Sequence, residues 1–220
     1  MLRATNVLIA GKSFVVSGYG SCGKGLAMRA KGMGANVIVT EMDHFKALQA
    51  ALDGFRVMRI EEAAKIGDIF VTVTGGKSVI RAEHVAKMKD GAIIANSGHF
   101  DIEIDVAALN KNYKKRKVRE SLEEYDVNGR KIYLCAQGRL VNLAAAEGHP
   151  SEVMATSFCG QALACKYLCD NRGKMKAGVI TLPPEIDDMI AELQLTAMGI
   201  EIDKPTAEQQ KYLTSWSEGT

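Results

Sequence analysis

Three spaced glycines at the end of a short apolar run constrain this chain more than any other feature. The run at 14–17 leads into Gly18, Gly20 and Gly23, and a helix-forming segment follows at 23–34. In a strand–turn–helix unit, the first glycine allows a tight turn, the second lets the backbone approach a pyrophosphate, and the third lets helix and strand pack closely. The pyrophosphate then lies on unpaired N–H groups at the positive end of the helix dipole. The spacing favours a dinucleotide site over a glycine-rich structural turn.

A carboxylate follows the next apolar run. Residues 37–40 lead into Glu41, about twenty residues beyond Gly18, where an acidic side chain meets the adenosine ribose hydroxyls. A carboxylate at that position also repels a 2′-phosphate. The two features together predict binding of NAD in preference to NADP.

From Lys12 onward, short apolar runs alternate with segments of helical periodicity. This alternation is typical of a parallel sheet covered on both faces, so it predicts an α/β fold with a Rossmann-type doubly wound parallel sheet. The predicted strands are 14–17, 36–40, 56–58, 68–74, 92–96 and 131–135. The predicted helices are 2–10, which ends at a glycine stop, 23–34, 45–53, 60–65, 81–88 and 105–109.

One histidine lies at the edge of the predicted sheet where ligands of this fold bind, the carboxyl ends of the strands. His99 follows the strand 92–96 beside a glycine, and this position favours a functional role over that of an ordinary loop histidine. His44 is expected to begin a helix and to face solvent. His84, inside the helix 81–88, is expected on the surface.

Charge patterning governs the interpretation of the next stretch. The basic segment 111–119 stands beside the acidic segment 120–126. We interpret the basic segment as a solvated connection next to the acidic one rather than as a patch for polyanions. The net charge of +2 gives no case for nucleic acid or an anionic membrane as a partner.

The C-terminal part of the chain is expected to form a helical extension. Its first helix, 153–169, is apolar on most sides, and such a helix must be covered on most sides, which implies a partner. Further helices are expected at 185–198 and 206–212. The predicted domains are a dinucleotide-binding domain at 1–150 and a helical region at 151–220.

The five cysteines indicate a reducing compartment. They include no C-x-x-C pair, so we expect reduced, buried thiols, without a disulfide framework or a metal site. No signal-peptide pattern opens the chain, and no apolar run approaches the roughly 18 residues of a membrane span. These observations predict a soluble, cytoplasmic protein. The cysteines are Cys22, Cys135, Cys159, Cys165 and Cys169.

Several motifs together are far more specific than the glycine spacing. They are Arg3-Ala4-Thr5-Asn6, Gly18-Tyr19-Gly20 with Gly23-Lys24-Gly25, Ala47-Leu48-Gln49-Ala50-Ala51, Gly98-His99-Phe100-Asp101 with Glu103-Ile104-Asp105, and Gly138-Arg139-Leu140-Val141-Asn142-Leu143 with Gly148-His149-Pro150-Ser151. Through them the chain resembles the S-adenosylhomocysteine hydrolase (adenosylhomocysteinase) family over nearly its whole length.

The resemblance implies a hydrolase that uses tightly held NAD twice in each turnover. Oxidation of the ribose 3′-hydroxyl of S-adenosylhomocysteine acidifies the neighbouring C4′ proton, homocysteine is eliminated, water adds, and the hydride returns to give adenosine. It also implies a homo-oligomer, either a dimer or a tetramer, and a place in the methionine cycle of one-carbon metabolism.

The resemblance further implies a role for each matching position. His99 and His149 would support catalysis, and Asn142 with His149 would close the cofactor and substrate site. The implied cofactor-binding residues are Gly18, Gly20, Ser21, Cys22, Gly23, Lys24 and Gly25 at the pyrophosphate, Glu41 and Lys46 at the adenosine ribose, Ser97, Gly98 and His99 at the nicotinamide, and Asn142 and His149.

Three departures from the family pattern affect these expectations. Lys46 stands where the family usually has asparagine, so it either weakens the preference for NAD or points into solvent. The segment 212–220 lacks the lysine- and tyrosine-bearing tail of longer members. The substrate-binding domain of the family, with its main acid–base residues, precedes the Arg3-Ala4-Thr5-Asn6 motif. We therefore expect a cofactor half that is inactive alone.

Two other functions compete with this interpretation. One is a stand-alone NAD-binding or regulatory module without hydrolase activity. The other is a 2-hydroxy-acid dehydrogenase, which shares the fold but needs an arginine and a histidine–carboxylate pair. No convincing set of those residues is present, so this alternative is disfavoured.

Overall fold

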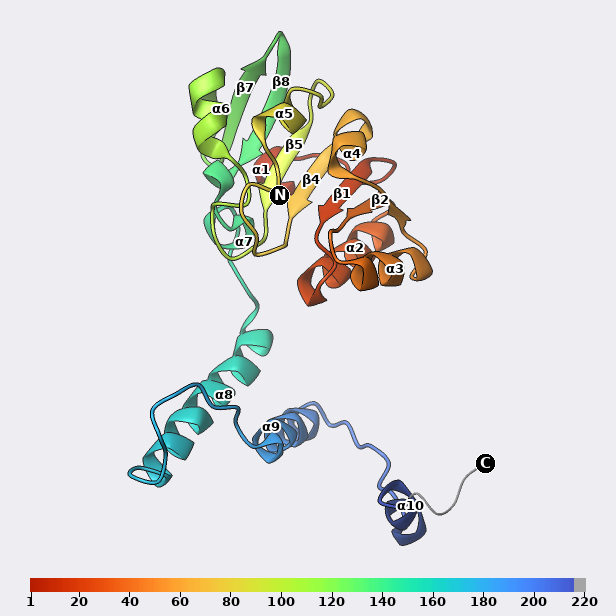
Figure 1. The fold of residues 1–220 in the computed structure, drawn as a ribbon, viewed down its shortest axis with the longest axis vertical. Helices are drawn as coiled ribbons and strands as arrows, with labels where there is room; N and C mark the ends of the chain where they lie inside the picture. The colour runs from red at the N-terminus through yellow and green to blue at the C-terminus, as the bar shows by residue number, and fades with distance from the viewer. Residues whose placement is uncertain (216–220) are drawn as a thin grey trace. The chain divides into compact units, whose positions relative to one another are not determined.

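The computed structural model describes residues 1–215, which divide into two units (Figure 1). The first unit is Met1–Gly148, and the second begins at His149. The first holds the sheet and its covering helices, and the second is helical. Residues 216–220 of the expected tail lie outside the described residues.

An eight-stranded sheet forms the centre of the first unit, with the order β3-β2-β1-β4-β5-β8-β7-β6. The strands from β3 to β8 in this order are parallel, whereas β7 and β6 run antiparallel to their neighbours. The confirmed fold is therefore α/β with a Rossmann-type sheet. The strands are β1 (Ser13–Ser17), β2 (Asn36–Thr40), β3 (Arg56–Val57), β4 (Ile69–Thr72), β5 (Ile93–Asn96), β6 (Lys114–Arg119), β7 (Leu122–Val127) and β8 (Arg130–Cys135).

Helices cover both faces of this sheet, and each face has its own apolar core. Side chains alternate along a strand, so Phe14 and Val16 of β1 face one core and Val15 faces the other. α1, α2, α3 and α7 contribute buried residues to the first core, and α4, α5 and α6 to the second. The helices are α1 (Leu2–Thr5), α2 (Ser21–Gly32), α3 (His44–Leu52), α4 (Ile60–Ile66), α5 (Ala82–Val85), α6 (Val106–Asn112) and α7 (Val141–Ala144), with a 3-10 turn at Ala136–Gly138.

The predicted helix at 2–10 is wrong beyond its first turn. α1 ends at Thr5, and its C-cap Asn6 adopts a left-handed conformation with φ 55°. Asparagine tolerates this conformation better than most residues, so it stops a helix as glycine does. Ile9 then lies buried in the first core. The sheet begins at Ser13, one residue before the predicted strand.

The connection predicted at 111–119 is solvent-exposed as expected, but it is not a loop, because residues 114–119 form the strand β6, which pairs with β7. Two ion pairs cross the ladder, with N–O distances of 3.0 Å for Lys115–Glu123 and 2.8 Å for Arg116–Glu124. Every residue of β6 is exposed. A row of cations on an edge strand discourages pairing with another chain. The charges therefore belong to a sheet edge rather than to a loop.

Up to residue 215, the second unit contains three helices: α8 (Ser151–Asp170), α9 (Pro184–Ala197) and α10 (Ala207–Leu213). No residue of α8 is buried, although it carries large apolar side chains. Val153 is 55% exposed, Phe158 57% and Leu168 50%. α8 contacts α9, whose Ile190 is buried. The apolar helix therefore forms as predicted, but within the described residues it is largely uncovered.

The expectation of buried thiols is wrong for four of the cysteines. Cys135 is buried at the end of β8, and burial raises the pKa of its thiol to about 11. The other cysteines are exposed and unpaired with one another. Among residues 1–215, no helix is long and apolar enough to cross a membrane, and no group of metal-binding side chains converges.

Candidate cofactor site

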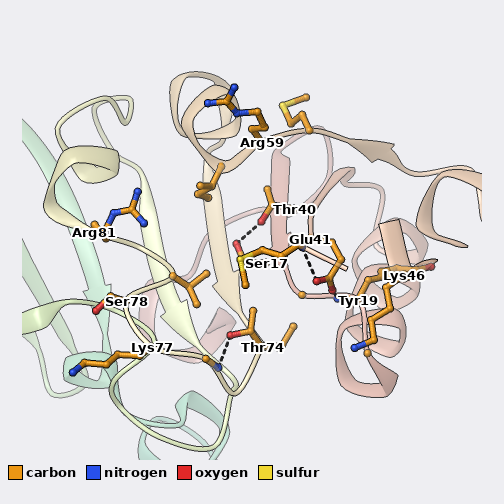
Figure 2. Close-up of a pocket in the computed structure, with 18 of the residues that line it drawn as sticks. Ser17, Tyr19, Thr40, Glu41, Lys46, Arg59, Thr74, Lys77, Ser78 and Arg81 are labelled. Carbon is orange, nitrogen blue, oxygen red and sulfur yellow. Dashed lines mark hydrogen bonds between the residues drawn. The ribbon is translucent and has the colours of Figure 1, made fainter. Parts of the chain in front are cut away.

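A pocket of about 500 Å³ opens at the carboxyl ends of β1, β2 and β4 (Figure 2). This is the edge where the fold binds ligands. Four cations and two carboxylates stand in its wall, and an excess of cations suits a ligand that carries phosphates. The lining residues are Ser17, Gly18, Tyr19, Gly20, Thr40, Glu41, Met42, Lys46, Met58, Arg59, Ile60, Glu61, Val73, Thr74, Gly76, Lys77, Ser78, Val79 and Arg81.

The glycine turn has the close approaches that its spacing predicts. Gly18 has φ 110°, and a Cβ there would lie 2.9 Å from the carbonyl oxygen of Val73. A Cβ on Gly23 would lie 2.0 Å from the carbonyl oxygen of Gly18, so α2 and β1 meet backbone to backbone. Nothing lies within 4 Å of the Cβ position of Gly20. The turn is thus closed where helix and strand pack and open where a phosphate would approach.

α2 begins at the edge of the pocket, because its N-cap Gly20 is a lining residue, although residues 21–25 are not. The helix begins at Ser21 after an N-cap at Gly20, which has no side chain to cap the first turn. The N–H groups of a first helical turn have no carbonyl partner inside the helix. Together with the helix dipole they form a site for an anion. Ser21 and Cys22 are both exposed there, so these residues fit a dinucleotide pyrophosphate.

Glu41 lies at the end of β2, and its carboxylate is held by backbone N–H groups. Oε2 accepts a hydrogen bond of 2.7 Å from the N–H of Tyr19, as Figure 2 shows, and Oε1 accepts one of 2.7 Å from Met42. The first bond ties Glu41 to the glycine turn across the two strands. Oε1 also accepts a 3.2 Å bond from the N–H of Asp43, whereas Oε2 keeps one of its two lone pairs for a ribose hydroxyl.

The two lysines of the predicted site have different surroundings. Lys24 Nζ lies 3.0 Å from Asp53 Oδ2, which also accepts a 2.8 Å hydrogen bond from the Tyr19 hydroxyl. These bonds, that of Tyr19 first, hold the pKa of Asp53 below its usual value. Lys24 therefore forms its ion pair outside the pocket, and neither Lys24 nor Asp53 is a lining residue. Lys46 does line the pocket, with its Nζ 3.9 Å from Asp43 Oδ2.

The loop that follows β5 carries Ser97, Gly98 and His99, which are not among the residues that line this pocket. Asn96 organises the loop: its Oδ1 accepts a 2.7 Å bond from the N–H of Gly98, and its Nδ2 donates a 2.8 Å bond to the carbonyl oxygen of Phe100. Gly98 is buried, whereas His99 is exposed, with its ring edge-on to Phe100 at 4.3 Å. The loop stands at the strand end next to β4.

Asn142 and His149 belong to different units. Asn142 lies in α7, and its carbonyl oxygen accepts a 2.9 Å bond from the N–H of Gly148. The preceding Leu140 forms a bridge with Asn96, so α7 begins beside the β5 strand end. His149 is exposed and opens the second unit. Its approach to the cofactor remains a prediction.

Glu103 is a buried residue near the site that sequence reasoning did not single out for a role. Its side chain is fully buried, and its carboxylate accepts hydrogen bonds from Thr74 and Gly75 in the loop after β4. The available signal was a lone carboxylate between Ile102 and Ile104. An acidic residue placed among apolar ones is buried only when its oxygens are satisfied.

The surface position predicted for His84 is wrong, because its side chain is fully buried. Nδ1 accepts a 3.2 Å bond from the N–H of Arg81, the N-cap of α5, and Nε2 lies 3.1 Å from the Arg81 guanidinium. Burial first and the Arg81 charge second lower the pKa of His84 below its ordinary value of 6.5, while Glu61 and Glu83 act in the opposite direction. The neutral ring thereby supports Arg81, which lines the pocket.

This lowered pKa predicts a loss of stability in mild acid. The unfolded chain takes up the His84 proton at a higher pH than the folded chain does. The stability is therefore complete above pH 6.5 and falls toward the folded pKa, by at most about 1.4 kcal/mol per pH unit. Urea unfolding at pH 7.0 and pH 5.5 measures the change. The loss of unfolding free energy between the two pH values should be smaller in His84→Gln than in the original chain. The control His44→Gln, at an exposed site, should show the full loss. Equal losses in the two variants would contradict the assignment of this pH dependence to His84.

Comparison with known proteins places these features in a family. The family model for the NAD binding domain of S-adenosyl-L-homocysteine hydrolase matches residues 1–148. The chain is 57% identical over 221 residues to adenosylhomocysteinase of Archaeoglobus fulgidus, covering 100% of this chain and 55% of that protein. It is 58% identical over 221 residues to S-inosyl-L-homocysteine hydrolase of Methanocaldococcus jannaschii, covering 100% and 53%. The chain thus spans about half the length of these curated relatives.

A solved structure agrees on the fold. Dipicolinate synthase A chain of Bacillus subtilis superposes with a TM-score of 0.52 at 17% identity, covering 79% of this chain and 51% of that chain. At this identity the likeness concerns the fold alone.

Proposed function

This chain belongs to the S-adenosyl-L-homocysteine hydrolase family, whose NAD-binding domain it matches over residues 1–148, and we propose that it is the NAD-binding portion of such a hydrolase. The whole enzyme would cleave S-adenosyl-L-homocysteine reversibly to adenosine and L-homocysteine. The observation that carries the proposal is the strand-end pocket, in which an open glycine turn, a helix N-terminus and Glu41 meet.

Within this proposal, each group of residues has a task. When bound, NAD would supply the oxidation of the substrate ribose and its later reduction. The first turn of α2 would bind the pyrophosphate, and Glu41 would accept hydrogen bonds from the adenosine ribose. Ser97, Gly98 and His99 would lie along the nicotinamide end. Asn142 and His149 would close the site toward the substrate, with His99 and His149 supporting proton movements.

The choice of nucleoside is part of the test. Proteins named adenosylhomocysteinase and S-inosyl-L-homocysteine hydrolase are about equally similar to this chain. The purified chain is titrated with NAD by calorimetry and then assayed for homocysteine with a thiol reagent, using each thioether as substrate. The assay is repeated after addition of the separately produced substrate-binding domain of the Archaeoglobus relative.

We expect the chain to bind NAD, to release no homocysteine alone, and to release it once the substrate-binding domain is supplied. NAD binding without release in either setting would favour a cofactor-binding or regulatory module instead. Absence of NAD binding would contradict both functions.

We also propose that residues 151–220 form a helical region that crosses between domains and assembles a homo-oligomer. The uncovered apolar surface of α8 supports this, and so does an apolar row on α3 in which Phe45 is 76% and Leu52 78% exposed. A cytoplasmic location and a place in the methionine cycle accompany the proposal.

The uncovered apolar surfaces predict association or dye binding. We expect light scattering to give a mass above that of one chain, or a hydrophobic dye to fluoresce with the chain. Phe158→Glu on α8 should reduce whichever signal is seen, whereas Gln161→Glu, an exposed polar position on the same helix, should not. A monodisperse monomer that binds no dye would contradict this proposal.

A further inference from the structure

We infer that Glu103 is a positioning residue that holds two loops of the cofactor site at a fixed spacing. The first is the β4 loop, residues 73–78, and the second is the β5 loop, residues 97–102. The inference rests on the proposed NAD site, because the first loop lines the pocket and the second carries the residues assigned to the nicotinamide end.

The Glu103 carboxylate is bonded to the β4 loop through both of its oxygens. Oε2 accepts a 2.9 Å bond from the N–H of Thr74 and a 3.0 Å bond from its hydroxyl, and Oε1 accepts a 2.7 Å bond from the N–H of Gly75. Thr74 lines the pocket, and its hydroxyl also accepts a 2.8 Å bond from Gly76, which Figure 2 shows. The carboxylate therefore fixes the backbone that forms one wall of the pocket.

The same carboxylate lies against the β5 loop. A Cβ on Gly98 would stand 1.6 Å from Oε1 of Glu103 and 3.1 Å from Oδ1 of Asn96. Only a glycine lets the loop come this close. Asn96 in turn accepts a hydrogen bond from the N–H of Gly98. The β5 loop is therefore held from both sides.

Backbone bonds complete the link between the loops. The N–H of Ser78 donates a 2.8 Å bond to the carbonyl oxygen of Ile102, and that of Ile80 donates a 3.1 Å bond to the carbonyl oxygen of Glu103. Packing alone does not account for a carboxylate here, because burying one costs free energy that an apolar side chain would not. What the carboxylate adds is a pair of acceptors that join one loop to the other. Glu103 is therefore placed to set the distance between the two loops, and with it the distance between the sites for the two ends of NAD.

Glu103→Gln tests the inference at constant side-chain volume. The amide places a donor where one carboxylate oxygen accepted, so at least one N–H of the β4 loop loses its partner. NAD and ADP-ribose, which lacks the nicotinamide, are titrated by calorimetry, and the midpoint of thermal unfolding is measured. We expect NAD binding to weaken by about tenfold or more, the loss of a charge-assisted hydrogen bond, and ADP-ribose binding by less than about threefold.

Asp105→Asn is the matched control. It makes the same carboxylate-to-amide change two residues away, at the N-cap of α6, where asparagine caps as well as aspartate. Both affinities should stay within about twofold of the original. If Glu103→Gln lowers the unfolding midpoint but keeps the original ratio of the two affinities, Glu103 is merely structural and the inference fails. If the unmodified chain does not bind NAD, the proposed function itself fails.

A milder variant keeps the test available if Glu103→Gln does not fold. Thr74→Val removes the hydroxyl bond to Glu103 together with the bond that the hydroxyl accepts from Gly76, whereas Thr74→Ser retains both and leaves the Glu103 carboxylate intact. The ratio of NAD to ADP-ribose affinity should fall by about threefold in the valine variant and stay unchanged in the serine variant. An unchanged ratio in both would overturn the inference.

Discussion

Gly23→Ala is expected to abolish measurable NAD binding and to lower the free energy of unfolding by about 3 kcal/mol. The added Cβ would lie 2.0 Å from the carbonyl oxygen of Gly18 and 2.7 Å from its carbonyl carbon. Both contacts are with backbone atoms, so no side chain can rotate to relieve them. α2 would have to move away from β1, and the first-turn N–H groups would move with it. Calorimetric titration with NAD and urea unfolding measure the two effects.

Gly32→Ala is the matched control for this change. Gly32 is the last residue of the same helix, and no atom lies within 4 Å of its Cβ position. Alanine should leave NAD affinity unchanged and add about 0.5–1 kcal/mol of stability, because it favours a helix more than glycine does. A Gly23→Ala chain that bound NAD within tenfold of the original affinity would contradict the proposed contact between α2 and β1.

The sequence predicted the features that depend on neighbouring residues. The spacing of Gly18, Gly20 and Gly23 predicts a tight turn with close backbone contacts between helix and strand, and the structure contains that turn. The alternating runs likewise report the strands of the parallel sheet, because each strand buried on both faces must be apolar. Glu41 was found for the same reason, since it directly follows such a strand.

The features that sequence reasoning missed depend on distant parts of the chain. His84 is buried because α4 and α5 pack together, which no pattern within its own helix reveals. The strands β6 and β7 carry charges on both faces, so they lack the alternation that marks a half-buried strand. One local signal was available there: Asn128-Gly129 has positive φ at both residues and joins β7 to β8, as this pair often does in hairpins.

The role of Glu103 in the candidate site could not be predicted from the sequence for the same reason. Its partners Thr74 and Gly75 lie almost thirty residues earlier in the chain. The sequence shows a carboxylate between isoleucines, but the pairing of Ile80 with Ile104, which brings the two loops together, has no signal in the sequence. The strand ends were thus predictable, whereas the bonds that join them were not.

Glu41→Ala is expected to remove most of the preference for NAD over NADP. The Glu41 carboxylate lines the pocket and is held there by the N–H groups of Tyr19 and Met42. Near a protein surface, two unit charges at about 4 Å repel each other by roughly 4 kcal/mol before screening by salt. Removing this repulsion of a 2′-phosphate, together with the acceptors for the ribose hydroxyls, should lower the preference at least about tenfold, which is about 1.4 kcal/mol. Calorimetric titrations with NAD and NADP give the ratio.

Two further variants separate charge from shape at this position. Glu41→Gln keeps the length of the side chain but removes its charge, so most of the loss seen with alanine should already occur. Lys46→Asn changes a cation in the same pocket wall, 3.9 Å from Asp43, and removing its attraction for a 2′-phosphate should raise the preference for NAD. Equal affinities of the unmodified chain for the two dinucleotides would contradict the role of Glu41. An unchanged preference in Lys46→Asn would instead mean that Lys46 points into solvent, away from the ribose.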